Sequence, residues 1–302
     1  MHQWGRLITA MITPFNDDGS VNYARAGTLA VEILNNGSDA LVVAGTTGES
    51  ATLYAEEKIR LIKTVKECVG NQGAVIAGTG SNFTAESVKL SAEAEKAGAD
   101  GLLLVAPYYN RPTQEGLYEH FKAIAAGSGL PVMLYNVPGR TSCSIDPDTV
   151  ARLSEIPNIV AIKDAGGSVG QTVKLLAAVP ADFEVYSGDD ALTLPMMAVG
   201  ASGVVSVAGH LAGGALKKMI RQFLEGDNKA AASLNIRLSG LFETLFVTSN
   251  PIPVKEMLNQ LGAGLGGHRL PLKETDVRTK EIIGACLLRY RELGLLDSFK
   301  SL

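Results

Sequence analysis

Short apolar runs alternate with longer amphipathic segments eight times in roughly the first 225 residues, and this rhythm constrains the fold more than any other feature. Such runs, rich in Val, Ile and Leu, are typical of parallel strands that are covered on both faces. Eight strand–helix units in this length predict a closed (β/α)8 barrel of the TIM type, which is an α/β fold. The eight predicted strands are Leu7–Ile12, Ala40–Ala44, Val75–Ala77, Leu102–Val105, Val132–Tyr135, Ile159–Ile162, Phe183–Tyr186 and Val204–Val207.

A doubly wound open sheet is the alternative architecture. It fits less well because no GxGxxG motif follows the first strand, where a dinucleotide-binding fold carries it. After residue 226 the pattern changes, and segments 229–246, 253–261 and 276–293 are predicted to be helices with no strand between them. We therefore expect a catalytic barrel over residues 1–226. A C-terminal α-helical appendage over residues 227–302 would pack on the barrel or on another subunit.

Composition and charge exclude several classes of function. The formal net charge is −4 and no basic run occurs, so we expect no nucleic-acid partner. No stretch approaches the ~20 apolar residues of a membrane span, and the first residues lack the pattern of a signal peptide. We therefore expect a cytoplasmic protein. The three cysteines and four histidines are scattered without metal-binding spacing, so we expect no bound metal.

Lys163 stands directly after the sixth predicted strand, at the end of the barrel where active sites lie. Because side chains alternate along a strand, Ala161 and Lys163 share one face, and Val160 and Ile162 share the other. If the bulky pair faces the helices, Lys163 points into the barrel. A lysine that loses hydration there is available as the neutral amine that attacks a carbonyl. The alternative is a lysine that reaches solvent or pairs with Asp164, although adjacent Asp164 should point the other way.

Three further features follow strand ends. Tyr135 ends the preceding strand, where a phenol pointing inward would shuttle protons, or would simply be a core tyrosine. Arg140 comes shortly after it, and would receive a carboxylate or be an ordinary surface arginine. The loop 107–112 carries two tyrosines between prolines, a composition typical of an interface.

The loop 45–50, with sequence GTTGES, follows the second strand. Its glycines and hydroxyls suit an anion, whereas a plain tight turn is the alternative. The loop lacks the GK[ST] ending of a phosphate cradle, and the acidic SGDD at 187–190 would repel phosphate near the usual barrel phosphate site. A small carboxylate therefore fits this loop better than a phosphate.

Taken together, five motifs closely resemble the dihydrodipicolinate synthase family, also called 4-hydroxy-tetrahydrodipicolinate synthases. They are GTTGES (45–50), PYYNRPTQEG (107–116), YNVPGRT (135–141), IKDA (162–165) and SGDD (187–190). The resemblance continues through NPIPVK at 250–255 and LPL at 270–272, so it covers nearly the whole chain. It implies a cofactor-free lyase that condenses pyruvate with L-aspartate 4-semialdehyde through a Schiff base. This reaction is the first committed step of lysine and diaminopimelate biosynthesis.

The resemblance also implies catalytic roles for four residues. Lys163 would form the Schiff base with pyruvate, and Tyr135 would donate and accept protons. Thr46 would link Tyr135 to Tyr109 in a hydrogen-bonded relay. In the family the tyrosine that matches Tyr109 comes from the neighbouring subunit. A tight dimer, usually within a homotetramer that is a dimer of dimers, would then complete the site.

Substrate-binding and regulatory positions follow from the same resemblance. Thr47 would hold the pyruvate carboxylate, Val205 and Gly188 would line the site of the adduct, and Arg140 would receive the carboxylate of aspartate semialdehyde. The positions that match the family's lysine-binding set are Ser50, Ala51, Asn82, Glu86 and Tyr108. Ala55 and Lys58 replace histidines that lysine-inhibited members often carry, so we expect weak or absent lysine feedback. His210, where relatives often have Asn, receives no role from the sequence.

Two alternatives to this function remain open at this point. One is another pyruvate-dependent class I aldolase, of the N-acetylneuraminate lyase or keto-deoxy sugar aldolase type. Those relatives generally have Ser in place of Thr46, and they lack the combination of PYYNRPTQEG and SGDD. The other is a non-catalytic barrel that binds pyruvate.

Overall fold

All eight predicted strands are present in a computed structural model, which describes residues 4–297. Each strand pairs in parallel with the next, and β1 pairs with β8, so the sheet closes into a barrel. The predicted (β/α)8 barrel is confirmed. The strands are β1 (Leu7–Ala10), β2 (Ala40–Val43), β3 (Ala74–Gly78), β4 (Gly101–Val105), β5 (Val132–Asn136), β6 (Ile159–Asp164), β7 (Glu184–Ser187) and β8 (Gly203–Ser206).

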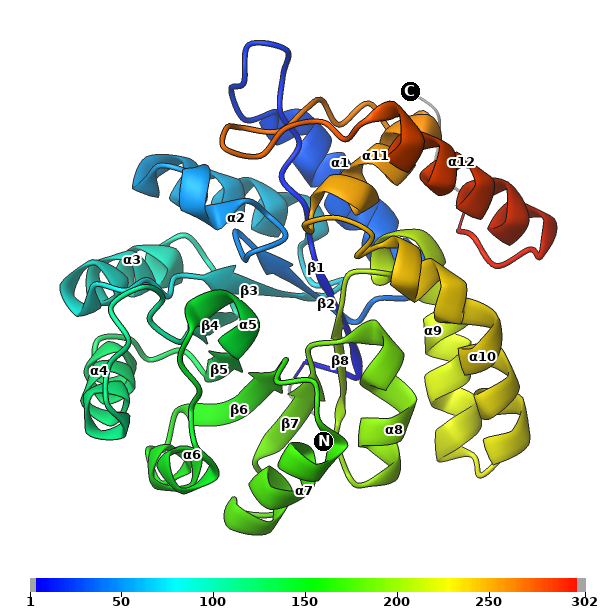
Figure 1. The fold of residues 1–302 in the computed structure, drawn as a ribbon. Helices are drawn as coiled ribbons and strands as arrows, with labels where there is room; N and C mark the ends of the chain where they lie inside the picture. The colour runs from blue at the N-terminus through cyan, green and yellow to red at the C-terminus, as the bar shows by residue number, and fades with distance from the viewer. Residues whose placement is uncertain (1–3, 298–302) are drawn as a thin grey trace.

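Helices surround the strands as a ring, and the C-terminal helices gather on one side of it, beside α9 (Figure 1). The helices of the ring are α1 (Tyr23–Asn35), α2 (Ala55–Val69), α3 (Thr84–Lys96), α4 (Gln114–Ala126), α6 (Pro147–Ser154), α7 (Val169–Ala178), α8 (Thr193–Ala198) and α9 (Gly209–Leu224). The short helix α5 (Pro138–Thr141), between β5 and α6, lies inside the ring (Figure 1). Two short 3-10 turns, η1 (Ser50–Thr52) and η2 (Asp190–Leu192), follow β2 and β7. The appendage consists of α10 (Asn228–Thr244), α11 (Ile252–Gln260) and α12 (Val277–Glu292), which confirms its predicted helical character. Among the helices that the structure describes, none is long and apolar enough to cross a membrane.

The apolar side chains form two layers. An inner layer fills the barrel with side chains such as Ile8, Met133 and Val205. An outer layer joins the other face of the strands to the helices, and it continues without a break into α10–α12, where Leu238 and Met257 are fully buried. Each such side chain contributes about 1.5–3 kcal/mol to stability through burial. The C-terminal helices are therefore held on the barrel by the same core that holds the helical ring.

One detail of the expected strand pattern is wrong. Val160 was expected to face the helices together with Ile162, but Val160 packs against the inner layer. The reason is a register shift between β5 and β6, where Val132 pairs with Ile159 while the next residue, Met133, pairs with Ala161. Beyond this irregularity the strict alternation resumes, so the direction of the functional end of β6 is unaffected.

Candidate active site

Lys163 lies inside the carboxyl end of the barrel, as its strand position predicted. It pairs in register with Tyr135 on the neighbouring strand, and its Nζ atom lies 4.2 Å from the centroid of the Tyr135 ring. Both side chains are only 5% exposed. The adjacent Asp164 points away and accepts hydrogen bonds from the Asn136 side chain at 3.0 Å and from the backbone N–H of Gly166 at 3.2 Å. Lys163 is therefore a buried amine beside a phenol, and the neighbouring carboxylate is engaged elsewhere.

Asp164 is itself shaped by burial. Loss of solvent raises the pKa of the Asp164 carboxyl, and the hydrogen bond from Asn136 opposes that effect. Asn136 in turn accepts a hydrogen bond from the backbone N–H of Ile145 at 3.1 Å. This chain of contacts fixes the outer face of β6, so the strand presents Lys163 to the barrel interior in a single direction.

Gly188 leaves the space that the Lys163 side chain occupies. A Cβ atom at this position would lie 2.6 Å from the Cβ atom of Ala165 and 3.1 Å from the Cε atom of Lys163. Only a residue without a side chain fits so close to both. Val205 lies on β8, fully buried in the inner layer. Both residues thus belong to the end of the barrel that surrounds Lys163.

The loop 45–50 turns sharply after β2. Ala44 and Glu49 adopt left-handed backbone conformations, with φ of 56° and 57°. Thr47 is 3% exposed, and its hydroxyl oxygen accepts a hydrogen bond from the Asn250 side chain at 2.9 Å. Because the oxygen is already an acceptor, the Thr47 hydroxyl proton is free to be donated to a ligand.

A cavity of about 360 Å³ opens above these residues. Its wall includes Thr46, Tyr135 and Arg140 from the predicted catalytic and substrate-binding sets, and Ser50, Ala51 and Tyr108 from the predicted regulatory set. Among the described residues with predicted roles, Lys163, Thr47, Gly188, Val205, Asn82, Glu86 and Tyr109 do not line it. One continuous cavity thus joins the mouth of the barrel to the predicted regulatory positions.

Asn250 is a site residue that the sequence did not reveal. It lines the cavity and is 6% exposed, and its backbone oxygen accepts a hydrogen bond from Arg140 at 3.2 Å. Its side-chain oxygen is buried without a partner among the described residues. An unpaired acceptor of this kind is costly, and it is commonly completed by a ligand or water. Asn250 begins the NPIPVK segment that resembles the family, but that resemblance gave it no role, and an Asn-Pro dipeptide before a helix indicates no more than a turn.

Comparison with known proteins identifies the family of this chain. The sequence model of the dihydrodipicolinate synthetase family matches residues 3–288. The chain belongs to this family. It is 55% identical to the 4-hydroxy-tetrahydrodipicolinate synthase of Moorella thermoacetica over 294 residues, which cover 97% of this chain and all of that one.

Solved structures of family members have the same fold. A dihydrodipicolinate synthase from Bacillus anthracis is 48% identical, with a TM-score of 0.93 over 95% of this chain and 99% of that one. The enzyme from Cyanidioschyzon merolae, whose structure has lysine bound, is 45% identical, with a TM-score of 0.94 over 96% of this chain and 99% of that one. Among the residues that the structure describes, no group of three or more His, Cys, Asp or Glu side chains is placed to hold a metal ion.

Tyr109 is the one predicted catalytic residue that a single chain of this family member leaves outside the site. Its side chain is 90% exposed, and its backbone has a φ of 74°. Tyr108 beside it is 38% exposed and lines the cavity. Such an exposed aromatic side chain is typical of a residue that another protein surface covers.

The predicted regulatory positions lie together near the outer part of the cavity. The Asn82 side chain donates a hydrogen bond to the backbone oxygen of Tyr108 at 3.2 Å. Lys58 lines the same space, where burial lowers its pKa and the negative charge of Glu86 opposes that effect. A cationic side chain therefore occupies part of the region in which the sequence placed a lysine-binding set.

His210 now has a physical explanation. Its Nε2 atom accepts a hydrogen bond from the backbone N–H of Ile12 at 3.1 Å, so Nδ1 carries the proton and donates to the backbone oxygen of Val207 at 2.8 Å. The ring is fully buried, and this burial lowers the pKa of His210 to about 4. His210 is a neutral structural residue that ties the segment after β1 to the start of α9.

Proposed function

We propose that the chain is a 4-hydroxy-tetrahydrodipicolinate synthase, a lyase that condenses pyruvate with L-aspartate 4-semialdehyde in lysine and diaminopimelate biosynthesis. The observation that carries this proposal is the buried amine of Lys163 beside the ring of Tyr135, at the active end of the barrel. A desolvated lysine amine is suited to attack a ketone, and a phenol beside it is suited to move the protons that this attack requires. Family membership over nearly the whole chain supports the same reaction.

The mechanism follows from these groups. The Lys163 amine attacks the ketone carbon of pyruvate, and Tyr135 delivers the proton that lets the carbinolamine lose water to form the imine. Loss of a methyl proton converts the imine into an enamine, whose carbon attacks the aldehyde of aspartate semialdehyde. The amino group of this second substrate then attacks the imine carbon, which closes the ring and releases Lys163. The imine serves as the electron sink, so no cofactor is required.

Pyruvate would be held by its carboxylate. The free hydroxyl proton of Thr47, together with the Thr47 backbone N–H, would donate to it, because the hydroxyl oxygen is already engaged by Asn250. Gly188 and Val205 would line the adduct on the other side. Thr46, which lines the cavity, would connect Tyr135 to Tyr109.

The second substrate would be recognised at the mouth of the cavity. Arg140 donates one N–H to the Asn250 backbone oxygen and keeps others for the carboxylate of aspartate semialdehyde. The same substrate also carries an ammonium group next to its carboxylate. N-acetylmannosamine and glyceraldehyde, the aldehyde substrates of the alternative aldolases, lack both charged groups.

We also propose the assembly and regulation that the family suggests. Exposed Tyr109 would enter the site of a neighbouring subunit in a tight dimer, within a homotetramer in the cytoplasm, with no nucleic-acid or membrane partner.

The catalytic barrel would span residues 1–226 and the helical appendage residues 227–302. The first three and last five residues of these ranges lie outside the described part of the chain. Lysine feedback through Ser50, Ala51, Asn82, Glu86 and Tyr108 would be weak or absent.

Reductive trapping tests the proposed function. The protein is incubated with pyruvate and borohydride, and the modified peptide is identified by mass spectrometry. We expect the adduct on Lys163, and a Lys163→Ala variant should neither trap pyruvate nor turn over. Full turnover by that variant, or an adduct at another position, would refute the mechanism. Turnover with aspartate semialdehyde, measured against N-acetylmannosamine and glyceraldehyde, separates the synthase from the other aldolases.

A further inference from the structure

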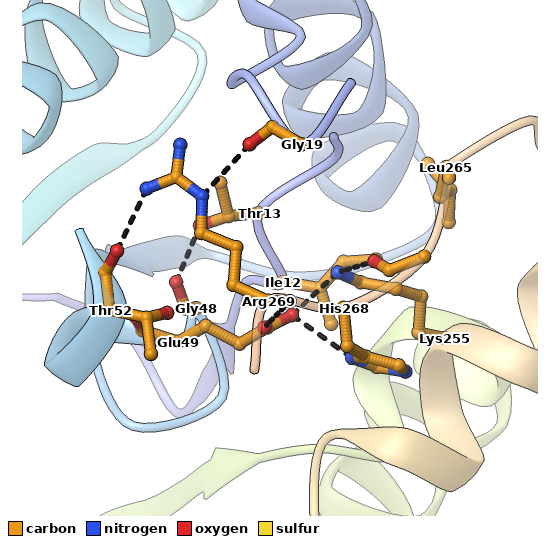
Figure 2. A network of polar contacts seen from close by, with 12 residues as sticks. Ile12, Thr13, Gly19, Gly48, Glu49, Thr52, Lys255, Leu265, His268 and Arg269 are labelled. Carbon is orange, nitrogen blue, oxygen red and sulfur yellow. Dashed lines mark hydrogen bonds and ion pairs between the residues drawn. The ribbon is translucent and has the colours of Figure 1, made fainter. Parts of the chain in front are cut away.

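A cluster of buried charges surrounds Glu49 of the loop 45–50 (Figure 2). The Nζ atom of Lys255, on α11, donates to the Oε1 atom of Glu49 at 2.6 Å, and neither side chain has any exposed surface. The Nδ1 atom of His268 lies 3.1 Å from the same oxygen, and the backbone N–H of Arg269 donates to the Oε2 atom of Glu49 at 3.2 Å. Both carboxylate oxygens of a residue in this loop are thus held by the C-terminal part of the chain.

Burial and hydrogen bonding act on Glu49 in opposite directions. Burial raises the pKa of Glu49, but the hydrogen bond from His268 and the charge of Lys255 outweigh that effect and lower the pKa overall. Glu49 is therefore ionised at neutral pH. Burial lowers the pKa of Lys255, and the negative charge of Glu49 opposes that effect. The Phe15 ring, whose centroid lies 4.4 Å from the Nζ atom of Lys255, and the backbone oxygen of Gly267 at 2.9 Å also favour the cation.

Fold stability alone is a poor explanation for this arrangement. Two charges must leave water to form a buried ion pair, and an apolar pair of similar volume is often as stable. Glu49 also has a left-handed backbone conformation, which is unfavourable for any residue other than glycine. Strain and buried charge therefore coincide at one residue, and that residue is two positions from Thr47.

Three consecutive loop residues are each held by a different anchor. The Thr47 hydroxyl accepts from the Asn250 side chain at 2.9 Å, and the Gly48 backbone oxygen accepts from the Thr13 hydroxyl at 2.6 Å. Glu49 is held by Lys255. The first and third anchors, Asn250 and Lys255, lie five residues apart in the sequence. The path of the backbone through 47–49 is thus fixed from one side by the segment that follows β1 and from the other by the residues that lead into α11 and form its first turn.

We propose that Glu49 and Lys255 are positioning residues for pyruvate, which aim Thr47 at the carboxylate of a pyruvate bound on Lys163. This inference rests on the proposed function and deepens it, since it assigns the pyruvate site to two segments far apart in the sequence. Glu49 belongs to the loop and to the cavity wall, whereas Lys255 does not line the cavity. Both would act on the ligand through the backbone of residues 47–49. Displacement of a binding group by about 1 Å is enough to lower a rate a hundredfold.

Two variants and one control test this inference on the full-length protein. Glu49→Met/Lys255→Met removes both charges and keeps unbranched side chains of similar length. Glu49→Gln keeps the shape of the carboxylate and weakens its charge-assisted hydrogen bonds. Lys66→Met is the control. Lys66 forms an ion pair with Asp100 at 2.8 Å, and the Asp100 carboxylate also accepts a hydrogen bond from the backbone N–H of Val75 in β3. This variant therefore also removes a lysine whose carboxylate partner holds the backbone.

We expect kcat/KM for pyruvate to fall about tenfold or more in the double variant, because the loss of one charge-assisted hydrogen bond corresponds to about a tenfold change in binding. In Glu49→Gln, which weakens these bonds without removing them, kcat/KM for pyruvate should fall severalfold. The kcat/KM for aspartate semialdehyde should stay close to wild type in both variants, and so should the thermal stability of the double variant. Glu49→Gln should melt at a lower temperature, because it leaves the Lys255 charge buried without its partner, and the control should retain wild-type kinetics. General loosening of the barrel would instead lower both kcat/KM values together with the melting temperature.

The outcomes are separable. A folded double variant or Glu49→Gln protein with wild-type kcat/KM for pyruvate overturns the inference. A parallel loss for both substrates that follows a fall in melting temperature overturns it as well, and if the double variant does not fold, Glu49→Gln decides alone. Wild-type protein that traps no pyruvate on Lys163 refutes the proposed function itself, whereas trapping by wild type with unchanged variants refutes only the positioning role.

Discussion

Lowering the pH should destabilise this protein through His210 in particular. The neutral His210 ring accepts a hydrogen bond from Ile12 and donates one to Val207, and it has no exposed surface. A second proton would remove the acceptor and leave a buried positive charge. Burial therefore lowers the pKa of His210 to about 4, from the 6.5 of an exposed histidine.

The sign and size of the effect follow from this difference. Between pH 6.5 and about 4 the unfolded chain binds the proton and the folded chain does not, so stability falls as the pH falls through that range. The stabilisation is fully present above pH 6.5, and its total is about 3.4 kcal/mol at 1.36 kcal/mol for each pKa unit. About 2.5 kcal/mol of it is lost by a pH of about 4.5. For a chain of 302 residues this loss corresponds to a fall of about 4 °C in the melting temperature.

Thermal unfolding of wild type and a His210→Gln variant from neutral pH to about pH 4.5, at equal protein concentration, measures this difference. Glutamine keeps an acceptor for the Ile12 N–H but does not titrate. Wild type should therefore lose about 4 °C more than the variant over this range. His120, whose pKa burial also lowers to about 4, titrates in both proteins and cancels. Melting curves that shift in parallel with pH would refute the reasoning.

Three further predictions concern the site. If Tyr109 acts in the neighbouring subunit, coexpressed Lys163→Ala and Tyr109→Phe chains should regain about a quarter of wild-type turnover. Half of the randomly formed dimers are mixed, and each mixed dimer has one intact site of its two. Activity no higher than that of Tyr109→Phe alone would contradict this prediction. Gly188→Ala should slow borohydride trapping of pyruvate about tenfold or more, since its Cβ atom would lie 2.6 Å from Ala165 Cβ and 3.1 Å from Lys163 Cε; a wild-type trapping rate would show that the site tolerates the methyl group. Lysine should leave the initial rate nearly unchanged because Lys58 repels its ammonium groups, and strong inhibition by sub-millimolar lysine would disprove this.

The strands were predictable because their sequence signal is local. A parallel strand that is buried on both faces is a short apolar run, and all eight runs became strands with ends shifted by no more than two residues. The four-residue helix α5 (Pro138–Thr141), which carries Arg140, is too short to produce a periodic pattern. The inward position of Val160 depends on a register shift between two strands, which no single strand's sequence records.

The same distinction separates the parts of the site. Lys163 and Tyr135 were predictable together because both end consecutive strands, and consecutive strands of a barrel are neighbours. His210 gave no signal, because its partners are backbone groups of the segment after β1 and of the turn before α9. The contact of Asn250 with Thr47 spans 203 residues of sequence, so neither periodicity nor a short motif could indicate it.

The segment 250–255, at the start of α11, lies in the predicted appendage but contacts residues of the predicted barrel. Thr47 and Glu49 are each held by a side chain from the segment 250–255, and Arg140 donates to a backbone oxygen of that segment. A chain that ended after α9 would contain the residues of all eight strands and of the Lys163–Tyr135 pair, yet it would lack these three anchors. The barrel supplies the proposed nucleophile, whereas groups around it are held by residues that follow the barrel in the sequence. The predicted boundary near residue 226 therefore describes the order of the chain, and the contacts of the candidate site extend across it.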